Sequence, residues 1–112
     1  MTDDTDRLLQ IFRKTVSSEI RLDQPDLTLR QLAVMLTVYG AEERQTVRGL
    51  AKHLNIAKPP VTRALDALRN LDLAHRESDS RDRRSVHIVR TEAGTAMMRR
   101  LAAAMATAAN AI

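Results

Sequence analysis

Two short amphipathic segments separated by three residues constrain the fold of this chain more than any other feature. The first segment follows Thr46, a residue type that caps helix N-termini, and its apolar residues have i, i+3, i+4, i+7 spacing: Val47, Leu50, Ala51 and Leu54. The second begins near Lys58 and has one apolar face: Val61, Ala64, Leu65, Leu68 and Leu71. Asn55, between them, tolerates the left-handed conformation of a tight turn. The pattern predicts a helix–turn–helix unit.

The details of this spacing support the same unit. Ala51 lies where the first helix must approach the second closely, and Val61 lies four residues beyond Ala57 and anchors the second helix. Pro59 and Pro60 fall in the first helical turn, where backbone N–H groups have no intrahelical acceptor. An ordinary helical hairpin is the alternative, because small residues and turns are common.

The periodicity changes after Leu71 and predicts a β-hairpin. Residues 73–77 and 85–90 are the expected strands, since Val86 and Ile88 alternate with His87 as in a half-buried strand. The intervening residues 78–84 are polar and rich in arginine. A hairpin with a basic tip directly after a helix–turn–helix is a wing.

Three further helices are predicted around this unit. The first covers about residues 4–22, and the second follows the capping-box residues Thr28 and Gln31 to about Tyr39. Apolar residues surround the second helix almost completely, so we expect it to be buried on all sides. The last helix begins after Thr91. The predicted fold class is mainly α with a small β-hairpin wing (α+β), in a single domain over residues 1–112. Its parts are an N-terminal dimerisation helix (1–22), a winged helix-turn-helix (28–90) and a C-terminal dimerisation helix (91–112).

The outer helices carry apolar stripes that need a partner surface. We expect a homodimer, with intrachain packing alone as the alternative. The interface is predicted to contain Leu8, Phe12, Val16, Met97, Leu101 and Met105.

Charge and composition indicate the kind of partner. The net charge is +4, but residues 1–43 carry five basic and eight acidic residues, whereas residues 44–100 carry thirteen and six. This asymmetry favours a polyanion as the partner of the later segment. The chain has no cysteine, no apolar run near the roughly 20 residues of a membrane span, and no signal-like start, so we expect a cytoplasmic protein without membrane contact.

The predicted partner is double-stranded DNA, and three groups of residues are expected to contact it. The recognition helix presents Lys58, Pro59, Thr62 and Arg63, whose positions suit the major groove. Arg63 is a candidate for reading guanine, with a phosphate contact or a solvated side chain as the equal alternative. The wing presents Arg81, Arg83 and Arg84 to a narrow minor groove, unless it is simply a solvated turn. Phosphates are expected to be positioned by Thr46, Arg48 and Lys52.

Nothing in the sequence indicates an enzyme. His53, His75 and His87 lack metal-ligand spacing, and there is no glycine-rich phosphate loop, nucleophile elbow or convincing acid–base pair. We therefore expect no catalytic residues, no metal and no cofactor. The alternative to a DNA-binding regulator is a winged-helix module for protein–protein contact, or a co-regulator without its own operator.

The sequence also resembles the multiple antibiotic resistance regulator (MarR) family over about residues 27–94. The resemblance is carried by TVRGLAKHLNIAKPPVTRALDAL from Thr46, DSRDRR from Asp79 and RTEAG from Arg90. It implies a homodimeric transcription regulator, either a repressor or an activator, on a palindromic operator, with a possible small-molecule effector between the dimer helices and the DNA-binding lobe. Of the two, we expect a repressor. It also implies that Arg84 enters the minor groove and that Asp82 orients it. Two features depart from the family: a shorter chain, and Ala57 where a serine usually caps the recognition helix.

Overall fold

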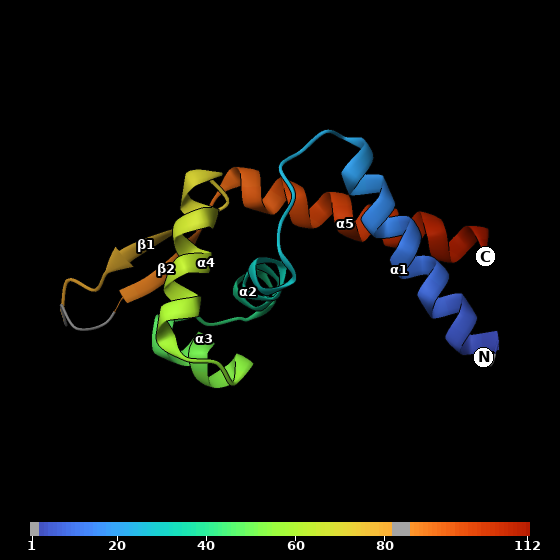
Figure 1. The fold of residues 1–112 in the computed structure, drawn as a ribbon. Coiled ribbons are helices and arrows are strands. Elements are labelled where there is room, and N and C mark those ends of the chain that lie inside the picture. The colour runs from blue at the N-terminus through green and yellow to red at the C-terminus, as the bar shows by residue number, and fades with distance from the viewer. Residues whose placement is uncertain (1–2, 82–85) are drawn as a thin grey trace. The chain divides into compact units, whose positions relative to one another are not determined.

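The chain folds into five helices and one antiparallel hairpin within the residues that the structure, a computed structural model, describes: 3–81 and 86–112. Figure 1 shows their order. The elements are α1 (Asp3–Arg21), α2 (Leu29–Gly40), α3 (Val47–Leu54), α4 (Lys58–Asn70), β1 (Ala74–Ser78), β2 (Val86–Arg90) and α5 (Glu92–Ala111). The predicted fold class is therefore confirmed, with every helix and strand boundary within about two residues of the expected one.

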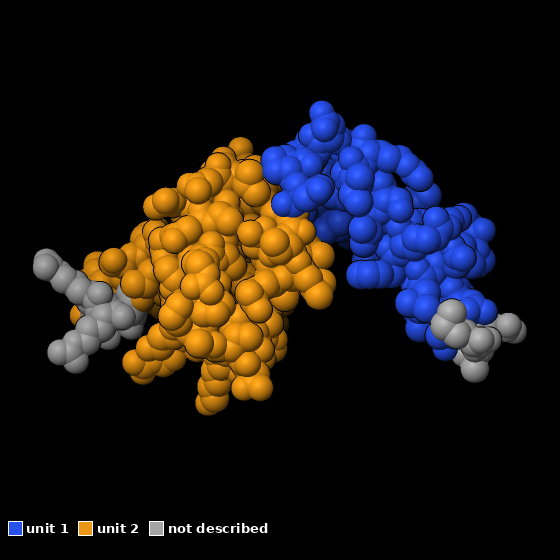
Figure 2. Space-filling model, in the orientation of Figure 1, with its two compact units in different colours: residues 1–26, 96–112 blue, residues 27–95 orange. Residues whose placement is uncertain are grey.

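The chain divides into two compact units, which Figure 2 shows in different colours. Unit 1 contains Met1–Asp26 and Ala96–Ile112, and unit 2 contains Leu27–Thr95. Unit 2 thus holds the helix–turn–helix and the hairpin, whereas unit 1 holds α1 and most of α5.

The core of unit 2 is built where α2, α3, α4 and the hairpin meet. Its largest fully buried side chains belong to the three helices and are Met35, Leu50, Leu65, Leu68, Val34 and Val61. The hairpin adds Ala74 and Ile88, which are also buried. This core places α4 with one face against the other elements and the opposite face in solvent.

The hairpin pairs β1 with β2 in the register Ala74↔Arg90 to Ser78↔Val86. A third segment, immediately before α3, lies along the other edge of β2. The Ile88 N–H donates to the Gln45 carbonyl at 2.8 Å, and Thr46 forms a bridge with His87. The wing is therefore attached to the start of α3 as well as to α4.

Helix α2 begins as predicted but is not buried on all sides. The capping box is present: the Gln31 N–H donates to Thr28 Oγ1 at 3.1 Å, and the Thr28 N–H donates to Gln31 Oε1 at 3.0 Å. Leu29 and Leu36 are 80% and 52% exposed, so the expectation of complete burial is wrong. Elements α3, α4 and β2 contact α2, whose buried residues are Val34, Met35 and Val38.

Within unit 1, α1 and α5 run antiparallel. Arg100 Nη2 donates to Glu19 Oε1 at 2.7 Å near one end, and Arg7 Nη2 donates to the Ala109 carbonyl at 3.4 Å near the other. The hydrogen bond from Arg100 to Glu19 raises the pKa of the Arg100 guanidinium. None of the described helices is long and apolar enough to cross a membrane.

The apolar stripe predicted on α1 faces solvent in the single chain. Ile11 and Thr15 are the buried residues of α1, whereas Leu8 and Phe12 are 61% and 56% exposed. The other residues predicted at a dimer interface differ in burial. Val16 and Met105 are exposed, Leu101 is half-buried, and Met97 is already buried within the chain.

Candidate DNA-binding surface

The turn between α3 and α4 sets the orientation of the recognition helix. Asn55 has φ 54° and ψ 46°, the left-handed conformation that the sequence predicted there. In this conformation its N–H donates to the Lys52 carbonyl at 3.2 Å, and the Ile56 N–H donates to the Ala51 carbonyl at 3.0 Å. These bonds satisfy two of the last four carbonyls of α3, and the chain enters α4 within three residues.

Helix α4 buries one face and exposes a basic one. Its buried residues are Val61, Ala64, Leu65 and Leu68. Of the predicted contact residues, Lys58, Pro59 and Arg63 are exposed and Thr62 is half-buried. Ala57 makes no side-chain cap, so the expected absence of a capping hydrogen bond is confirmed. The helix is therefore held mainly by its apolar face, which leaves its N-terminal half free to meet a ligand.

The predicted phosphate-positioning residues lie on α3, but they differ in their environment. Arg48 and Lys52 are exposed. Thr46 is half-buried, and its Oγ1 accepts a hydrogen bond from the Gly49 N–H at 2.9 Å as the N-cap of α3. Thr46 therefore has a structural role as the cap of α3. Its hydroxyl proton is still available to a phosphate oxygen.

The base of the wing is held by Asp79, which sequence reasoning did not single out. Its Oδ1 accepts a hydrogen bond from the Arg81 N–H at 2.8 Å, and its Oδ2 lies 3.3 Å from His87 Nε2. The Arg81 side chain is exposed. The remaining wing residues predicted to contact DNA, namely Asp82, Arg83 and Arg84, lie outside the described residues.

An ion pair fixes the hairpin to the recognition helix. Arg76 on β1 donates through Nη2 to Asp66 Oδ1 on α4. Its side chain is 28% exposed and that of Asp66 is 44% exposed, so the pair is partly shielded from solvent. The two elements expected to contact DNA are therefore linked by a side-chain bond as well as by packing.

A polar cluster around Tyr39 joins the end of α2 to the start of α5 and was also missed. The Tyr39 hydroxyl donates to the Leu73 carbonyl at 2.6 Å and accepts from the Thr91 N–H at 3.0 Å. The Arg90 guanidinium lies over the Tyr39 ring, 5.6 Å from its centroid, and donates to the Val38 and Ala41 carbonyls. Gly94 leaves room for this hydroxyl, because an added Cβ would lie 1.7 Å from it.

A signal for this cluster was present in the sequence. Gly94 stands in the first turn of a helix, where glycine is a poor helix former, and this position suggests that another group approaches closely. The partner of that close approach is 55 residues away in the chain, so the sequence alone did not identify it.

Six basic residues of unit 2 differ in whether the protein itself engages their charges. Arg76 and Arg90 are engaged by the protein itself, through Asp66 and through backbone carbonyls. Within residues 3–81 and 86–112, no ion pair is formed by Arg48, Lys52, Lys58 or Arg63. These four cations belong to α3 and α4, and their charges remain available to an external anion.

The histidines form no metal centre in the described part of the chain. His75 Nε2 lies 2.8 Å from Asp72 Oδ1, and His87 pairs with Asp79. No group of three or more potential ligands gathers among the described residues.

A helix–turn–helix followed by a hairpin that packs on its second helix defines a winged-helix protein. The chain belongs to the MarR family: the model of that family matches residues 26–85, which is more than half of the chain. Members of this family are transcriptional regulators rather than enzymes.

Solved structures share this fold. The transcriptional regulator Tm0710 from Thermotoga maritima superposes with a TM-score of 0.74 at 19% identity, over 95% of this chain and 75% of that chain. The YusO protein from Bacillus subtilis gives 0.71 at 19% identity, over 92% and 70%. Reduced AbfR bound to DNA gives 0.67 at 23% identity, over 93% and 71%. A comparison with curated protein sequences found no match.

Proposed function

We propose that the chain is a homodimeric transcription regulator that binds a specific double-stranded operator and acts as a repressor. In this proposal each α4 enters the major groove of one half-site, and each wing enters the adjacent minor groove. The solved structure of AbfR bound to DNA, which shares the fold, supports the choice of ligand.

One observation carries the proposal: the exposed face of α4 is basic while its other face is completely committed to the core. Val61 and Leu68 are fully buried, and Lys58 and Arg63 are exposed without an ion-pair partner in the described chain. A helix that keeps cations in solvent along its N-terminal half suits a polyanion whose groove admits a helix.

Each predicted contact has a specific role in this arrangement. Arg63 is proposed to read guanine by a bidentate hydrogen bond, Thr62 to contact a thymine methyl or a phosphate, and Pro59 to make apolar contact only. Lys58 is proposed to bind phosphate, together with Arg48 and Lys52 of α3, and Thr46 to donate its hydroxyl proton.

The wing contacts are proposed to come from Arg81, Arg83 and Arg84, with Asp82 orienting Arg84. The bond from the Arg81 N–H to Asp79 supports the contact proposed for Arg81, because it holds the backbone of this residue close to the end of β1. The ion pair between Arg76 and Asp66 supports it as well, since a wing attached to α4 keeps a constant spacing between the two groove contacts.

The dimer is proposed to form through the exposed stripe on α1. Leu8, Phe12 and Val16 leave a row of apolar side chains in solvent, which a monomer rarely tolerates. Leu101 and Met105 of α5 are proposed to extend the interface.

A small-molecule effector is also part of the proposal. Its support is the solved structure of the PcaV regulator from Streptomyces coelicolor with its natural ligand, which shares the fold at 20% identity.

A binding titration tests the proposal. The purified chain is titrated with the DNA that flanks its own gene and with an unrelated duplex of equal length, at about 50 mM and about 200 mM salt. Tight, selective binding that falls by at least about 10³-fold between the two salt concentrations is expected for several phosphate contacts. Weak binding, equal on both duplexes, would favour the protein-interaction module instead.

A further inference from the structure

The helices of the helix–turn–helix region carry charges opposite to those that usually stabilise helix N-termini. The first turns of α2, α3 and α4 contain Arg30, Arg48 and Lys58 and no acidic residue. In contrast, α5 begins with Glu92. A cation at the positive end of a helix dipole lowers the stability of the folded protein when no anion is bound. Arg48 and Lys58 are already accounted for by the proposed function, whereas Arg30 is not.

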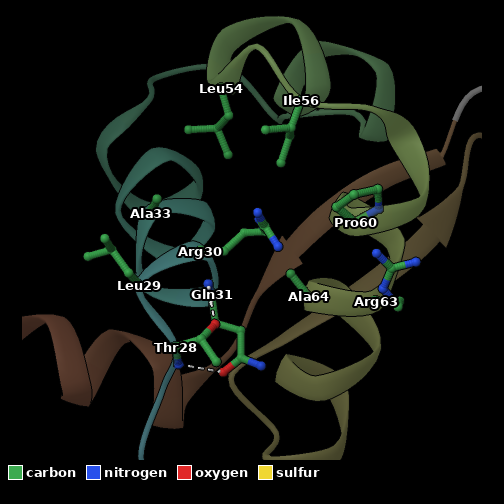
Figure 3. Close-up of a pocket in the computed structure, with 10 residues that line it drawn as sticks. All are labelled: Thr28, Leu29, Arg30, Gln31, Ala33, Leu54, Ile56, Pro60, Arg63 and Ala64. Carbon is green, nitrogen blue, oxygen red and sulfur yellow. Dashed lines mark hydrogen bonds between the residues drawn. The ribbon is translucent and has the colours of Figure 1, made fainter.

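Arg30 lines an open hollow of about 590 Å³ together with Arg63 of the recognition helix (Figure 3). Both side chains extend toward Pro60 in this view, one from α2 and one from α4. The ten lining residues include these two arginines and no aspartate or glutamate. Within the described chain Arg30 forms no ion pair, and it is exposed.

The start of α2 also offers backbone donors beside this cation. The capping box satisfies the N–H groups of Thr28 and Gln31. The N–H groups of Leu29 and Arg30 lie in the first turn, where no intrahelical acceptor exists. Both residues are exposed. A single anion at this end of α2 would therefore meet a guanidinium, the positive end of the helix dipole and two N–H groups.

We propose that Arg30 binds a backbone phosphate of the duplex whose bases Arg63 contacts, as a further DNA contact beside the recognition helix, the wing and the phosphate-positioning residues of α3. This inference rests on the proposed function. Because Arg30 and Arg63 line the same hollow, a duplex engaged by Arg63 passes close to the start of α2. The contact positions α4 on the DNA and carries no base specificity of its own.

The salt dependence of binding tests this role. Fluorescence anisotropy gives the affinity of the wild type, Arg30→Ala and Arg30→Lys for an operator duplex and an unrelated duplex over a range of salt concentrations. The slope of log affinity against log salt is negative, and each lost phosphate contact reduces its magnitude by about 0.9, or by about 1.8 for a dimer. Arg30→Ala is expected to show this change with an equal fold-loss on both duplexes, and Arg30→Lys is expected to retain most of the slope.

Arg99→Ala is the matched control, since Arg99 is also exposed but lies in unit 1. It removes the same charge and should leave the slope unchanged. An Arg30→Ala slope equal to that of the wild type would overturn the inference while leaving the proposed function intact. A wild-type chain that binds neither duplex with salt dependence would instead reject the proposed function.

Two further measurements separate the alternatives. Inorganic phosphate at matched ionic strength should not compete with the duplex more strongly than chloride does. Competition that disappears in Arg30→Ala would assign the site to a free anion and overturn the inference. Arg30→Glu should raise the unfolding midpoint or leave it unchanged, because it suits the helix dipole, and should still weaken DNA binding. A parallel loss of stability and binding would give Arg30 a structural role.

Discussion

Replacing Gly94 with alanine should destabilise this protein, although the same change usually stabilises a helix. A Cβ at this position would lie 1.7 Å from the Tyr39 hydroxyl and 2.4 Å from the Leu73 carbonyl oxygen. The second contact is with backbone, so the strain cannot be relieved by moving the tyrosine alone. The 1.7 Å approach also displaces the Tyr39 hydroxyl, so its hydrogen bonds with Leu73 and Thr91 are lost.

The expected magnitude follows from these contacts. The bonds to the Leu73 carbonyl and from the Thr91 N–H contribute roughly 1 kcal/mol each. Repacking around a backbone clash adds about 1–3 kcal/mol. Alanine regains about 1 kcal/mol of helix propensity. The free energy of unfolding should therefore fall by about 2–4 kcal/mol, which corresponds to a midpoint lower by roughly 10–15 °C in a domain of this size.

Thermal and urea unfolding followed by far-ultraviolet circular dichroism, at one protein concentration, measures this change. Gly40→Ala is the matched control, because a Cβ at Gly40 would meet nothing within 4 Å and should be neutral or mildly stabilising. In the Tyr39→Phe background, Gly94→Ala should cost less than in the wild type, since the two changes remove the same hydrogen bonds. A Gly94→Ala protein as stable as the wild type would refute this account of the cluster.

The remaining predictions concern capping and DNA contact. Thr46→Ala should lower the free energy of unfolding by about 1 kcal/mol, because the hydroxyl that caps the Gly49 N–H is lost. Ala57→Ser should raise it by up to about 1 kcal/mol, because serine supplies the missing cap of α4. Urea titrations measure both changes. Arg63→Ala should relax the preference at one base pair, by about 1–3 kcal/mol, in a panel of single-base operator variants; an equal loss on every duplex would make Arg63 a phosphate contact. Arg84→Ala should weaken operator binding without changing the unfolding midpoint, and unchanged affinity would reject the wing assignment.

Features that depend on neighbouring residues were predictable from the sequence. The capping box of Thr28 and Gln31, the left-handed Asn55 and the uncapped Ala57 are all present in the structure. Each depends on hydrogen bonds within about four residues of the chain, so the residue types and their spacing contain the necessary information. The strong 3.6-residue periodicity of α3 and α4 likewise predicted which face of each helix is buried.

Features that depend on distant residues were not predictable in the same way. Tyr39 meets Thr91 and Gly94 across more than 50 residues, and no periodicity indicates such a contact. Leu29 and Leu36 give a second example, because their apolar pattern predicted burial and both side chains are exposed. An apolar pattern reports that a surface can be buried, but the packed elements decide which part of it is covered.

The burial of α1 illustrates this point for the proposed dimer. The sequence predicted one apolar stripe that includes Leu8 and Phe12, whereas the single chain buries Ile11 and Thr15 and leaves the stripe in solvent. Two faces of α1 therefore have separate partners in this account: one within the chain, and one proposed in a second copy.

The most direct test of the central proposal is selection of preferred duplexes from a random-sequence pool by the purified chain. The account predicts enrichment of a two-fold symmetric sequence whose half-sites lie about 10–10.5 base pairs apart, centre to centre, because each protomer places one α4 in successive major grooves on the same side of the duplex. Enrichment of a single unsymmetric half-site would contradict the homodimer. No enrichment at all would contradict site-specific DNA recognition.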